Sequence, residues 1–229
     1  MITLEKVNKT YYTGHQPIVA LKDVSFSVNQ GEFVSLVGKS GAGKTTLIKM
    51  IIAEELPSQG TVSFGGFDLS RLRSSALQKI RKKIGVVHQD YRLLDKKTVK
   101  ENLEYIMQVI GVSDKSIKRD IPQVLEVVGL EERINNFPPE LSGGEKQRLA
   151  IARALIHRPD VVIADEPTGN LDLYNTCEII NLLKRINQMK TAVILSTHDR
   201  EIINKLRKRV ITLEQGRVIS DEPRGRFIL

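Results

Sequence analysis

Tryptophan is absent from this chain of 229 residues, and it has a single cysteine. One cysteine, Cys177, excludes an internal disulfide and any zinc site with several cysteine ligands, which fits a reducing compartment. We expect Cys177 to be a passive packing residue. Long apolar runs are missing too, because no stretch approaches the ~18 residues that cross a bilayer. The N-terminal segment MITLEKVNKTYY alternates apolar and polar residues, which predicts a strand rather than a signal peptide and favours a cytoplasmic protein.

The formal net charge of +8 is compatible with three kinds of partner: nucleic acid, an anionic membrane surface, or a bound triphosphate. Basic residues cluster at 81–83, around Lys96 and at 205–209, far apart in sequence and without aromatic residues between them. Clusters of this kind favour solvated faces over a nucleic-acid site. Charge alone does not choose among the three partners.

Three hydrophobic patterns follow one another along the chain. Short β-like runs fill the first third, as in ITLEKV and GEFVSLVG. Apolar residues three and four apart then predict helices over residues 70–83 and 99–129, which would form a helical insertion. Beyond Pro159, apolar strands at 161–165 and 191–197 alternate with helices, one of them over 172–188, and such alternation predicts a parallel sheet. The tail from Asp221 onward is expected to be peripheral.

These patterns predict one α/β domain with a mainly parallel sheet. We assign residues 1–90 and 159–229 to its core, and residues 91–158 to an inserted helical subdomain.

A phosphate-binding loop is the clearest chemical signal. Residues 38–45, GKSGAGKT, fit G-x-x-x-x-G-K-[ST] and lie between an apolar strand and a helix, as the motif requires. The glycines let backbone N–H groups face a phosphate, Lys44 adds charge, and the Thr45 hydroxyl can bind Mg²⁺. A chance glycine-rich turn is the alternative, and the flanking strand and helix argue against it. The predicted phosphate-binding residues are Gly38, Lys39, Ser40, Gly41, Ala42, Gly43, Lys44, Thr45 and Thr46.

Two adjacent carboxylates end the apolar strand VVIAD. Asp165 can hold Mg²⁺ through water beside the phosphate loop. Glu166 follows it and can accept a proton from the water that attacks the γ-phosphate, so we predict that Glu166 is the general base. A solvated acidic turn before Pro167 is the alternative, which the upstream phosphate loop makes less favourable.

A second glycine motif, LSGGEKQR, covers residues 141–148 and opens a strongly helical stretch. Ser142 is placed to cap this helix, and Glu145 three residues on would complete a capping box. The resulting helix N-terminus is suited to an anion. This motif also matches the signature of the ATP-binding-cassette ATPases residue by residue, and the chain resembles that family over nearly its whole length.

The resemblance implies a P-loop NTPase core of the RecA-like type, with an N-terminal antiparallel β-subdomain and an inserted α-helical subdomain. It also implies ATP and Mg²⁺ as ligands. In this family Ser142, Gly143 and Gly144 would contact the γ-phosphate of ATP held by a second subunit, so a homodimer is expected to form on ATP binding.

Further matches assign roles by the same resemblance. Gln89 corresponds to the glutamine that senses Mg²⁺ and the γ-phosphate, His198 to the switch histidine, and Asp172 to the loop that crosses the dimer interface. Tyr11 corresponds to the aromatic that stacks on adenine, although the adjacent Tyr12 is an alternative. The implied catalytic residues are therefore Glu166, His198, Lys44 and Gln89, and the implied metal-binding residues are Thr45, Gln89 and Asp165.

Within the family, QDYRLLDKKTVKENL and ADEPTGNLD are most similar to the cell-division branch, whose membrane partner is FtsX. This implies a cytoplasmic chain bound to the inner face of the membrane, with Asp90–Val99 as the partner contact. Leu93 and Leu94 would be exposed there if they serve the partner, or core residues if they do not. His88 departs from the branch, which usually has phenylalanine at this position.

Two other functions stay open on the sequence. The first is the ATPase subunit of a lipoprotein or macrolide exporter, since ADEPTGNLD is shared with those relatives. The second is a soluble cassette protein acting on nucleic acid, which we rank last because the chain carries neither a long coiled coil nor a second cassette. No nucleic-acid partner is expected.

Overall fold

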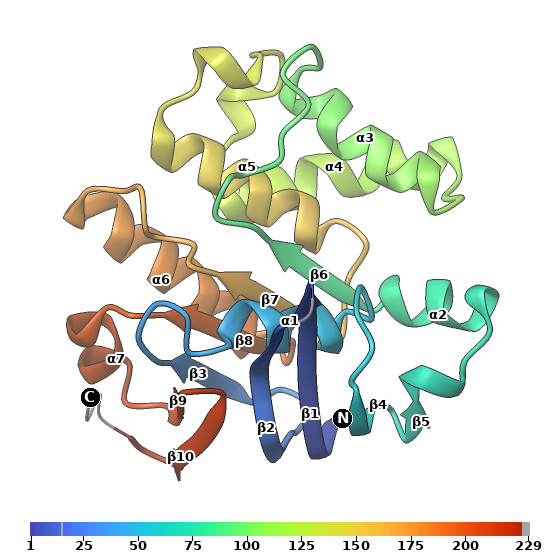
Figure 1. The fold of residues 1–229 in the computed structure, drawn as a ribbon. Helices are drawn as coiled ribbons and strands as arrows, with labels where there is room; N and C mark the ends of the chain where they lie inside the picture. The colour runs from blue at the N-terminus through green and yellow to red at the C-terminus, as the bar shows by residue number, and fades with distance from the viewer. Residues whose placement is uncertain (15, 226–229) are drawn as a thin grey trace.

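The computed structural model describes residues 1–14 and 16–225, which form two sheets and a group of helices (Figure 1). The first sheet is antiparallel and has the strand order β2-β1-β4-β5. Strand β1 pairs along nearly its whole length with β2, and β4 lies on its other side. The bounds are β1 (Ile2–Thr13), β2 (Gln16–Val28), β4 (Gln59–Phe64) and β5 (Phe67–Asp68).

The second sheet has six strands in the order β10-β9-β3-β8-β7-β6. Every neighbouring pair is parallel except β10 with β9, so the prediction of a mainly parallel sheet is confirmed. Asp221 and Glu222 end β10, so the start of the tail lies in the edge strand of this sheet; residues 226–229 lie outside the described residues. The bounds are β3 (Phe33–Val37), β6 (Ile84–Val87), β7 (Val161–Asp165), β8 (Ala192–Thr197), β9 (Arg209–Glu214) and β10 (Arg217–Glu222).

Helices α3, α4 and α5 gather beyond one edge of the six-stranded sheet, at the top of Figure 1. The predicted helix over 99–129 is interrupted, because the chain turns at Gly111 with φ 81° and Ser113 caps a new helix. The predicted helix over 70–83 likewise divides into a 3-10 turn and α2. The bounds are α1 (Lys44–Ile51), α2 (Ser74–Arg81), α3 (Val99–Val109), α4 (Asp114–Val128), α5 (Gly143–Leu155), α6 (Leu173–Gln188) and α7 (Arg200–Leu206), with 3-10 turns at Leu69–Arg71, Glu131–Arg133 and Pro138–Glu140.

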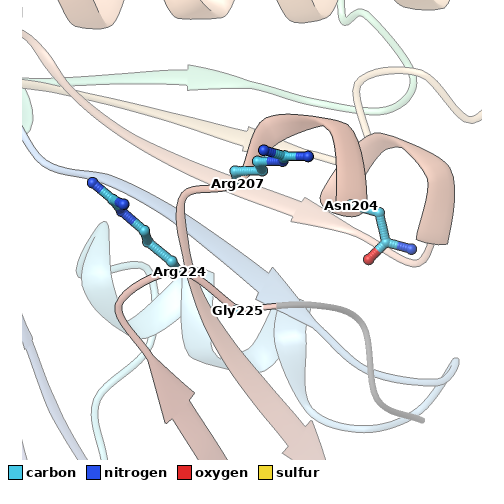
Figure 2. Close-up of a pocket in the computed structure, with 4 residues that line it drawn as sticks. All are labelled: Asn204, Arg207, Arg224 and Gly225. Carbon is cyan, nitrogen blue, oxygen red and sulfur yellow. The ribbon is translucent and has the colours of Figure 1, made fainter.

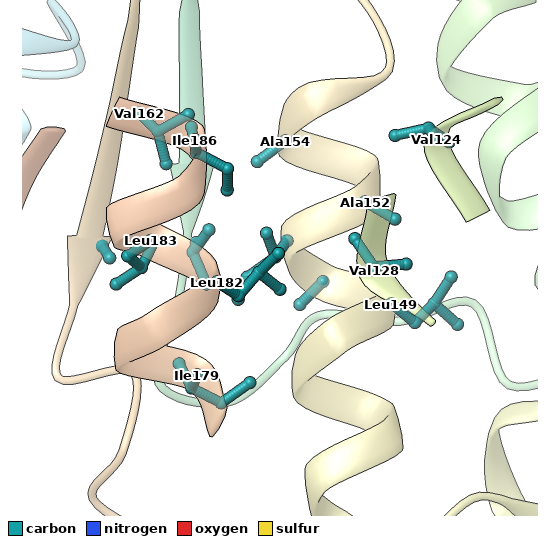
Figure 3. Close-up of a cluster of buried hydrophobic side chains, with 14 of the residues drawn as sticks. Val124, Val128, Leu149, Ala152, Ala154, Val162, Ile179, Leu182, Leu183 and Ile186 are labelled. Carbon is teal, nitrogen blue, oxygen red and sulfur yellow. The ribbon is translucent and has the colours of Figure 1, made fainter. Parts of the chain in front are cut away.

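Apolar side chains cover both faces of the six-stranded sheet. Val162 of β7 packs into a core with helices α4, α5 and α6 (Figure 3), whereas its neighbours Val161 and Ile163 pack into a second core with α1 and the antiparallel sheet. This alternation explains why β7 is apolar throughout, as expected of a buried parallel strand. Cys177 is exposed on α6, so the expectation that it packs in the interior is wrong. None of the helices within the described residues is both long and apolar enough to span a bilayer.

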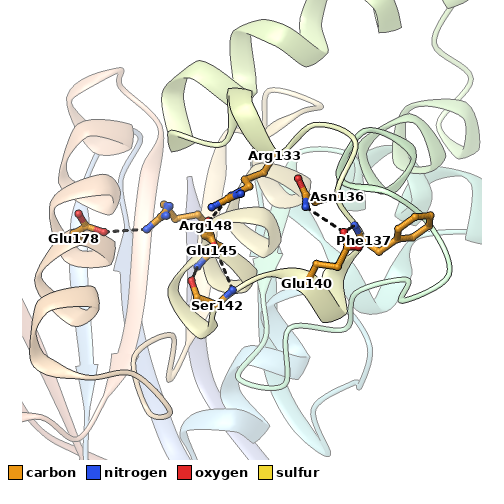
Figure 4. Close-up of polar contacts among 8 residues, drawn as sticks. All are labelled: Arg133, Asn136, Phe137, Glu140, Ser142, Glu145, Arg148 and Glu178. Carbon is orange, nitrogen blue, oxygen red and sulfur yellow. Dashed lines mark hydrogen bonds and ion pairs between the residues drawn. The ribbon is translucent and has the colours of Figure 1, made fainter.

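The N-terminus of α5 is held by a capping box that the sequence predicts. Ser142 Oγ accepts a hydrogen bond from the Glu145 amide at 3.3 Å, and Glu145 Oε2 accepts one from the Ser142 amide at 2.8 Å. The guanidinium of Arg133 donates to the other Glu145 oxygen at 2.8 Å (Figure 4). The hydrogen bond from the Ser142 backbone, aided by Arg133, lowers the pKa of Glu145 to about 2.

Replacing Glu145 should therefore destabilise the fold in a pH-dependent way. Glu145→Gln is expected to lower the free energy of unfolding by about 1 kcal/mol at pH 7, because a neutral amide does not pair with Arg133. The pKa of Glu145 in the folded state, about 2, lies below its value of 4.5 in the unfolded chain. The carboxylate therefore stabilises the fold fully at pH values above 4.5, and this stabilisation is lost as the pH falls toward 2. Urea unfolding at pH 7 and pH 3.5 measures the difference, with exposed Glu132→Gln as the control. If Glu145→Gln lowered the free energy of unfolding by the same amount at both pH values, this role of the carboxylate would be contradicted.

Candidate nucleotide site

The phosphate loop connects β3 to α1 and depends on close backbone contacts. Gly43 has φ 105°, and a side chain there would place Cβ 2.7 Å from Leu21 Cδ2. A Cβ on Gly38 would lie 2.4 Å from the carbonyl oxygen of Leu213. Both glycines are therefore required by the path of the backbone as well as by the motif.

Lys44 is buried in this loop, with a relative exposure of 8%. Its ammonium donates to the Gly38 carbonyl at 2.7 Å and lies 3.4 Å from the Lys39 carbonyl oxygen. These carbonyl oxygens compensate the positive charge of the Lys44 ammonium in a loop whose predicted ligand is a phosphate.

A cavity of about 810 Å³ opens over the loop, in the size range of small-molecule sites. Residues 39–46 line it together with Gln89, Glu166 and His198, so residues from four separate sequence motifs meet there. Ile18, Val19 and Ala20 of β2 and Arg200 also line it, and sequence reasoning missed all four. No sequence motif marks those strand residues, which reach the loop through tertiary packing, as where Gly43 lies against Ala20 and Leu21.

Glu166 links a lysine to a histidine at the mouth of this cavity. Its Oε1 lies 3.5 Å from Lys44 Nζ, and its Oε2 lies 2.9 Å from His198 Nδ1. The carboxylate accepts in the second contact, which requires a proton on Nδ1. The Glu166 side chain is mostly buried, whereas that of His198 is 68% exposed. This arrangement presents one oriented carboxylate beside the phosphate loop.

The backbone at Glu166 is strained. Its φ of 49° lies in the left-handed region, which a residue with a side chain rarely adopts and which costs on the order of 1 kcal/mol or more. The Glu166 amide donates to the Ser196 carbonyl at 3.0 Å, and the carbonyl of Glu166 accepts from the Gly169 amide at 3.2 Å. These bonds fix the turn that follows β7.

Asp165 has the surroundings of a metal ligand. Its Oδ2 accepts a hydrogen bond from the Thr45 hydroxyl at 3.2 Å, while its buried Oδ1 has no hydrogen-bond partner among the described residues. Gln89 lies nearby, because it lines the same 410 Å³ cavity as Thr45 and Asp165. A carboxylate, a hydroxyl and an amide oxygen are hard oxygen ligands, and Mg²⁺ usually takes only one or two carboxylates beside phosphates and water. The residues present therefore fit Mg²⁺.

The signature residues lie apart from this cavity, against the first turn of α6. A Cβ added to Gly144 would lie 2.0 Å from Asn175 Oδ1, and one added to Gly143 would lie 3.5 Å from Leu171 Cδ2. Asp172 caps α6: its Oδ1 accepts from the Asn175 amide at 2.8 Å, and its Oδ2 accepts from the Asn175 side chain at 2.7 Å. Neither Asp172 nor the signature lines the phosphate-loop cavity of its own chain.

The two tyrosines of β1 differ in their surroundings. Tyr11 is half-buried and lies opposite Ile18 in the β1–β2 ladder, whereas Tyr12 is 77% exposed. Tyr11 does not itself line the cavity, but its cross-strand neighbour Ile18 does. The geometry favours Tyr11 over Tyr12 as the residue nearer the loop.

The segment after Gln89 decides between the two alternatives for its leucines. Leu93 packs against the core that contains α3 and α5, and Leu94 is half-buried, so the core alternative is favoured over exposure. His88 is also half-buried; burial lowers its pKa, and the guanidinium of Arg92, 3.4 Å from its Nε2, adds to that effect. His88 also lines the 410 Å³ cavity that contains Thr45, Gln89 and Asp165.

Another cavity, of about 530 Å³, lies near the C-terminal end of the described chain. Asn204, Arg207, Arg224 and Gly225 line it, and the two arginine side chains extend in different directions (Figure 2). It therefore lacks the converging polar groups of the phosphate-loop cavity.

Comparisons with known proteins agree with this site. The model of the ABC transporter family matches residues 21–169. The chain is 48% identical to the cell division ATP-binding protein FtsE of Streptococcus pneumoniae, over 99% of this chain and 97% of that protein. It is 47% identical to FtsE of Mycobacterium tuberculosis, over 98% and 97% of the two chains.

A solved structure matches equally well. The dimeric structure of the ATP-binding cassette MJ0796 in a post-hydrolysis state, bound to ADP and Pi, has a TM-score of 0.89 and 36% identity over 99% of this chain and 100% of that chain. The predicted family and fold are thereby confirmed, including the antiparallel β-subdomain. The chain belongs to the ABC transporter family and is an ATPase of its ATP-binding-cassette type.

Proposed function

We propose that this chain works as an ATP-driven homodimer that moves a separate membrane protein during cell division. The observation that carries the proposal is the contact chain from Lys44 through Glu166 to His198 at the phosphate loop. It joins a phosphate-binding cation, a base and an orienting group in one cavity, which are the parts that ATP hydrolysis requires.

Binding of the triphosphate uses the loop and α1. Phosphate oxygens would replace the Gly38 and Lys39 carbonyls as partners of Lys44, and the backbone N–H groups at the start of α1 would complete the cradle. Thr45, Asp165 and Gln89 would hold Mg²⁺, which when bound neutralises charge on the β- and γ-oxygens.

Hydrolysis then depends on Glu166. His198 holds Oε2 through its Nδ1 proton, which leaves Oε1 to accept a proton from the attacking water. The same oxygen, Oε1, lies 3.5 Å from Lys44 Nζ. Phosphates that take the lysine therefore free the base, so substrate binding and activation of the water are connected through one side chain.

The second half of the site would come from another copy of the chain. Ser142, Gly143 and Gly144 form a capped helix N-terminus, suited to an anion, that does not line the cavity of its own chain. The family resemblance assigns them to the γ-phosphate of the partner subunit, and dimeric structures of the relative MJ0796 support this assembly.

The family resemblance assigns FtsX as the membrane partner, Asp90–Val99 as the contact and the inner face of the membrane as the location, and similarity to FtsE proteins supports this assignment. Since Leu93 packs inward, the exposed part of this segment is charged and includes Arg92, Asp95 and Lys96. We therefore assign the contact to these charged side chains rather than to leucines.

Glu166→Gln should reduce phosphate release by about 10²-fold or more, because the amide does not accept the proton. It should also trap an ATP-bound dimer, since closure needs ATP and reopening needs hydrolysis. A phosphate-release assay and light scattering with saturating ATP and Mg²⁺ measure the two effects, with exposed Glu126→Gln as the matched control. If Glu166→Gln released phosphate at the wild-type rate, Glu166 would not be the general base. If this variant stayed monomeric with saturating ATP and Mg²⁺, the proposed ATP-bound dimer would be refuted.

Lys44→Ala should weaken ATP binding by about 100-fold or more, because the phosphates lose a buried charge-assisted donor. Equilibrium titration with a fluorescent ATP analogue measures the loss. Lys83→Ala removes one exposed lysine and is the control. Unchanged affinity in Lys44→Ala would refute the assignment.

Charge reversal at the partner segment should break the membrane contact and leave chemistry intact. The double variant Asp95→Lys, Lys96→Glu is expected to lose co-purification with the membrane protein encoded beside this chain, while the ATPase rate of the isolated chain stays unchanged. Lys118→Glu, on the exposed face of α4, is the control. Retained co-purification would place the contact elsewhere.

A further inference from the structure

One acidic residue outside the known motifs holds Tyr11 in place. The Tyr11 hydroxyl donates a hydrogen bond of 2.5 Å to Glu55 Oε2. Glu55 lies in the loop that follows α1, 44 positions further along the chain than Tyr11. The bond therefore ties strand β1 of the antiparallel sheet to the helix that begins at the phosphate loop.

Two lysines complete the arrangement. Lys49 Nζ lies 3.3 Å from Glu55 Oε1, and Lys9 Nζ lies 3.2 Å from Glu55 Oε2. Lys9 also sits over the Tyr11 ring, with its ammonium 5.0 Å from the ring centroid, and donates to the Leu56 carbonyl at 2.9 Å. Both oxygens of Glu55 are thus occupied, and the ring of Tyr11 is contacted at its hydroxyl and on one face.

The protonation states suit a hydrogen bond from phenol to carboxylate. The bond from Tyr11 lowers the pKa of Glu55, and the two lysines add to that effect, so Glu55 is charged at neutral pH. Burial raises the pKa of Tyr11, and the contact with Glu55 raises it further, so the phenol keeps its proton. A charged acceptor makes this bond stronger than one between neutral groups.

The position of Tyr11 gives the contact its significance. Tyr11 lies opposite Ile18, which lines the phosphate-loop cavity, and Thr46 in the first turn of α1 lines the same cavity. An aromatic ring on the strand beside this cavity is suited to receive the base of a nucleotide whose phosphates lie on the loop. A ring already fixed in one orientation loses less conformational entropy when the base arrives.

We propose that Glu55 is a positioning residue for nucleotide binding, which fixes the ring of Tyr11 beside the phosphate loop so that the adenine base can stack on it. The inference rests on the proposed function of Tyr11. Glu55 touches neither the phosphates nor the reacting atoms, so it governs affinity for the base and not the rate of hydrolysis.

The test compares ATP with a ligand that has phosphates but no base. Glu55→Ala is expected to raise the Kd of ATP by about 5-fold, as expected when one ordered side chain becomes free, and to leave the Kd of tripolyphosphate within about two-fold. The maximal rate of ATP hydrolysis should not change. Glu126→Ala removes the same charge from the exposed face of α4 and is the control, and Glu55→Gln, which keeps an acceptor for the phenol, should stay within about two-fold of the wild type.

A double-mutant cycle with Tyr11→Phe separates this role from a structural one. Because both residues act through one hydrogen bond, the double variant should bind ATP no more weakly than Glu55→Ala alone. Three results would each overturn the inference. They are an equal loss of affinity for ATP and for tripolyphosphate, additive effects of the two substitutions on the ATP Kd, and an unchanged ATP Kd in Glu55→Ala. If the wild-type chain did not bind ATP, the proposed function itself would be refuted. If Tyr11→Ala bound ATP with normal affinity, only the stacking of adenine on Tyr11 would be refuted.

Discussion

The buried ammonium of Lys44 is the charge around which this site is organised. A lone buried charge is costly, and here the Gly38 and Lys39 carbonyls and the Glu166 carboxylate surround it. The lysine thereby connects the loop after β3 with the turn after β7, and Glu166 extends the connection to His198 after β8. In the proposed function, a triphosphate that enters the loop would compete for the same ammonium and so change the surroundings of Glu166.

Sheet topology explains why these groups meet. Strands β3, β8 and β7 are adjacent and parallel, so their carboxyl ends share one edge, where α/β sheets bind ligands. The register pairs Val37 with Thr197 and Asp165 with Ser196, which aligns the strand ends that carry the phosphate loop, His198 and Glu166. Successive apolar residues of β7 pack on opposite faces of the sheet. Helices α4, α5 and α6 cover one face and α1 covers the other, and this packing on both sides keeps the edge rigid.

The motifs that line the phosphate-loop cavity are predictable from sequence because each one follows the end of a parallel strand, β3, β6, β7 or β8. The fold follows for the same reason, apart from details such as the turn at Gly111 that divides the predicted helix over 99–129. Ile18 and Glu55 are not predictable, since they reach the site through strand pairing and a loop contact that leave no local pattern. The sequence left Leu93 open between an exposed residue and a core residue, and only the tertiary structure shows that its side chain packs inward.

The turn between β7 and α6 joins the two halves of the proposed dimer site within one chain. It begins at Glu166 and ends at Asp172, and hydrogen bonds from Gly169 to Glu166 and from Leu171 to Thr168 keep it compact. At its far end Asn175 packs on Gly144 of the signature, and Arg148 of α5 bonds Glu178 of α6 at 2.9 Å (Figure 4). In the proposed dimer, these contacts would connect the signature, which is assigned to the partner's ATP, with the turn that carries Glu166 in the same chain.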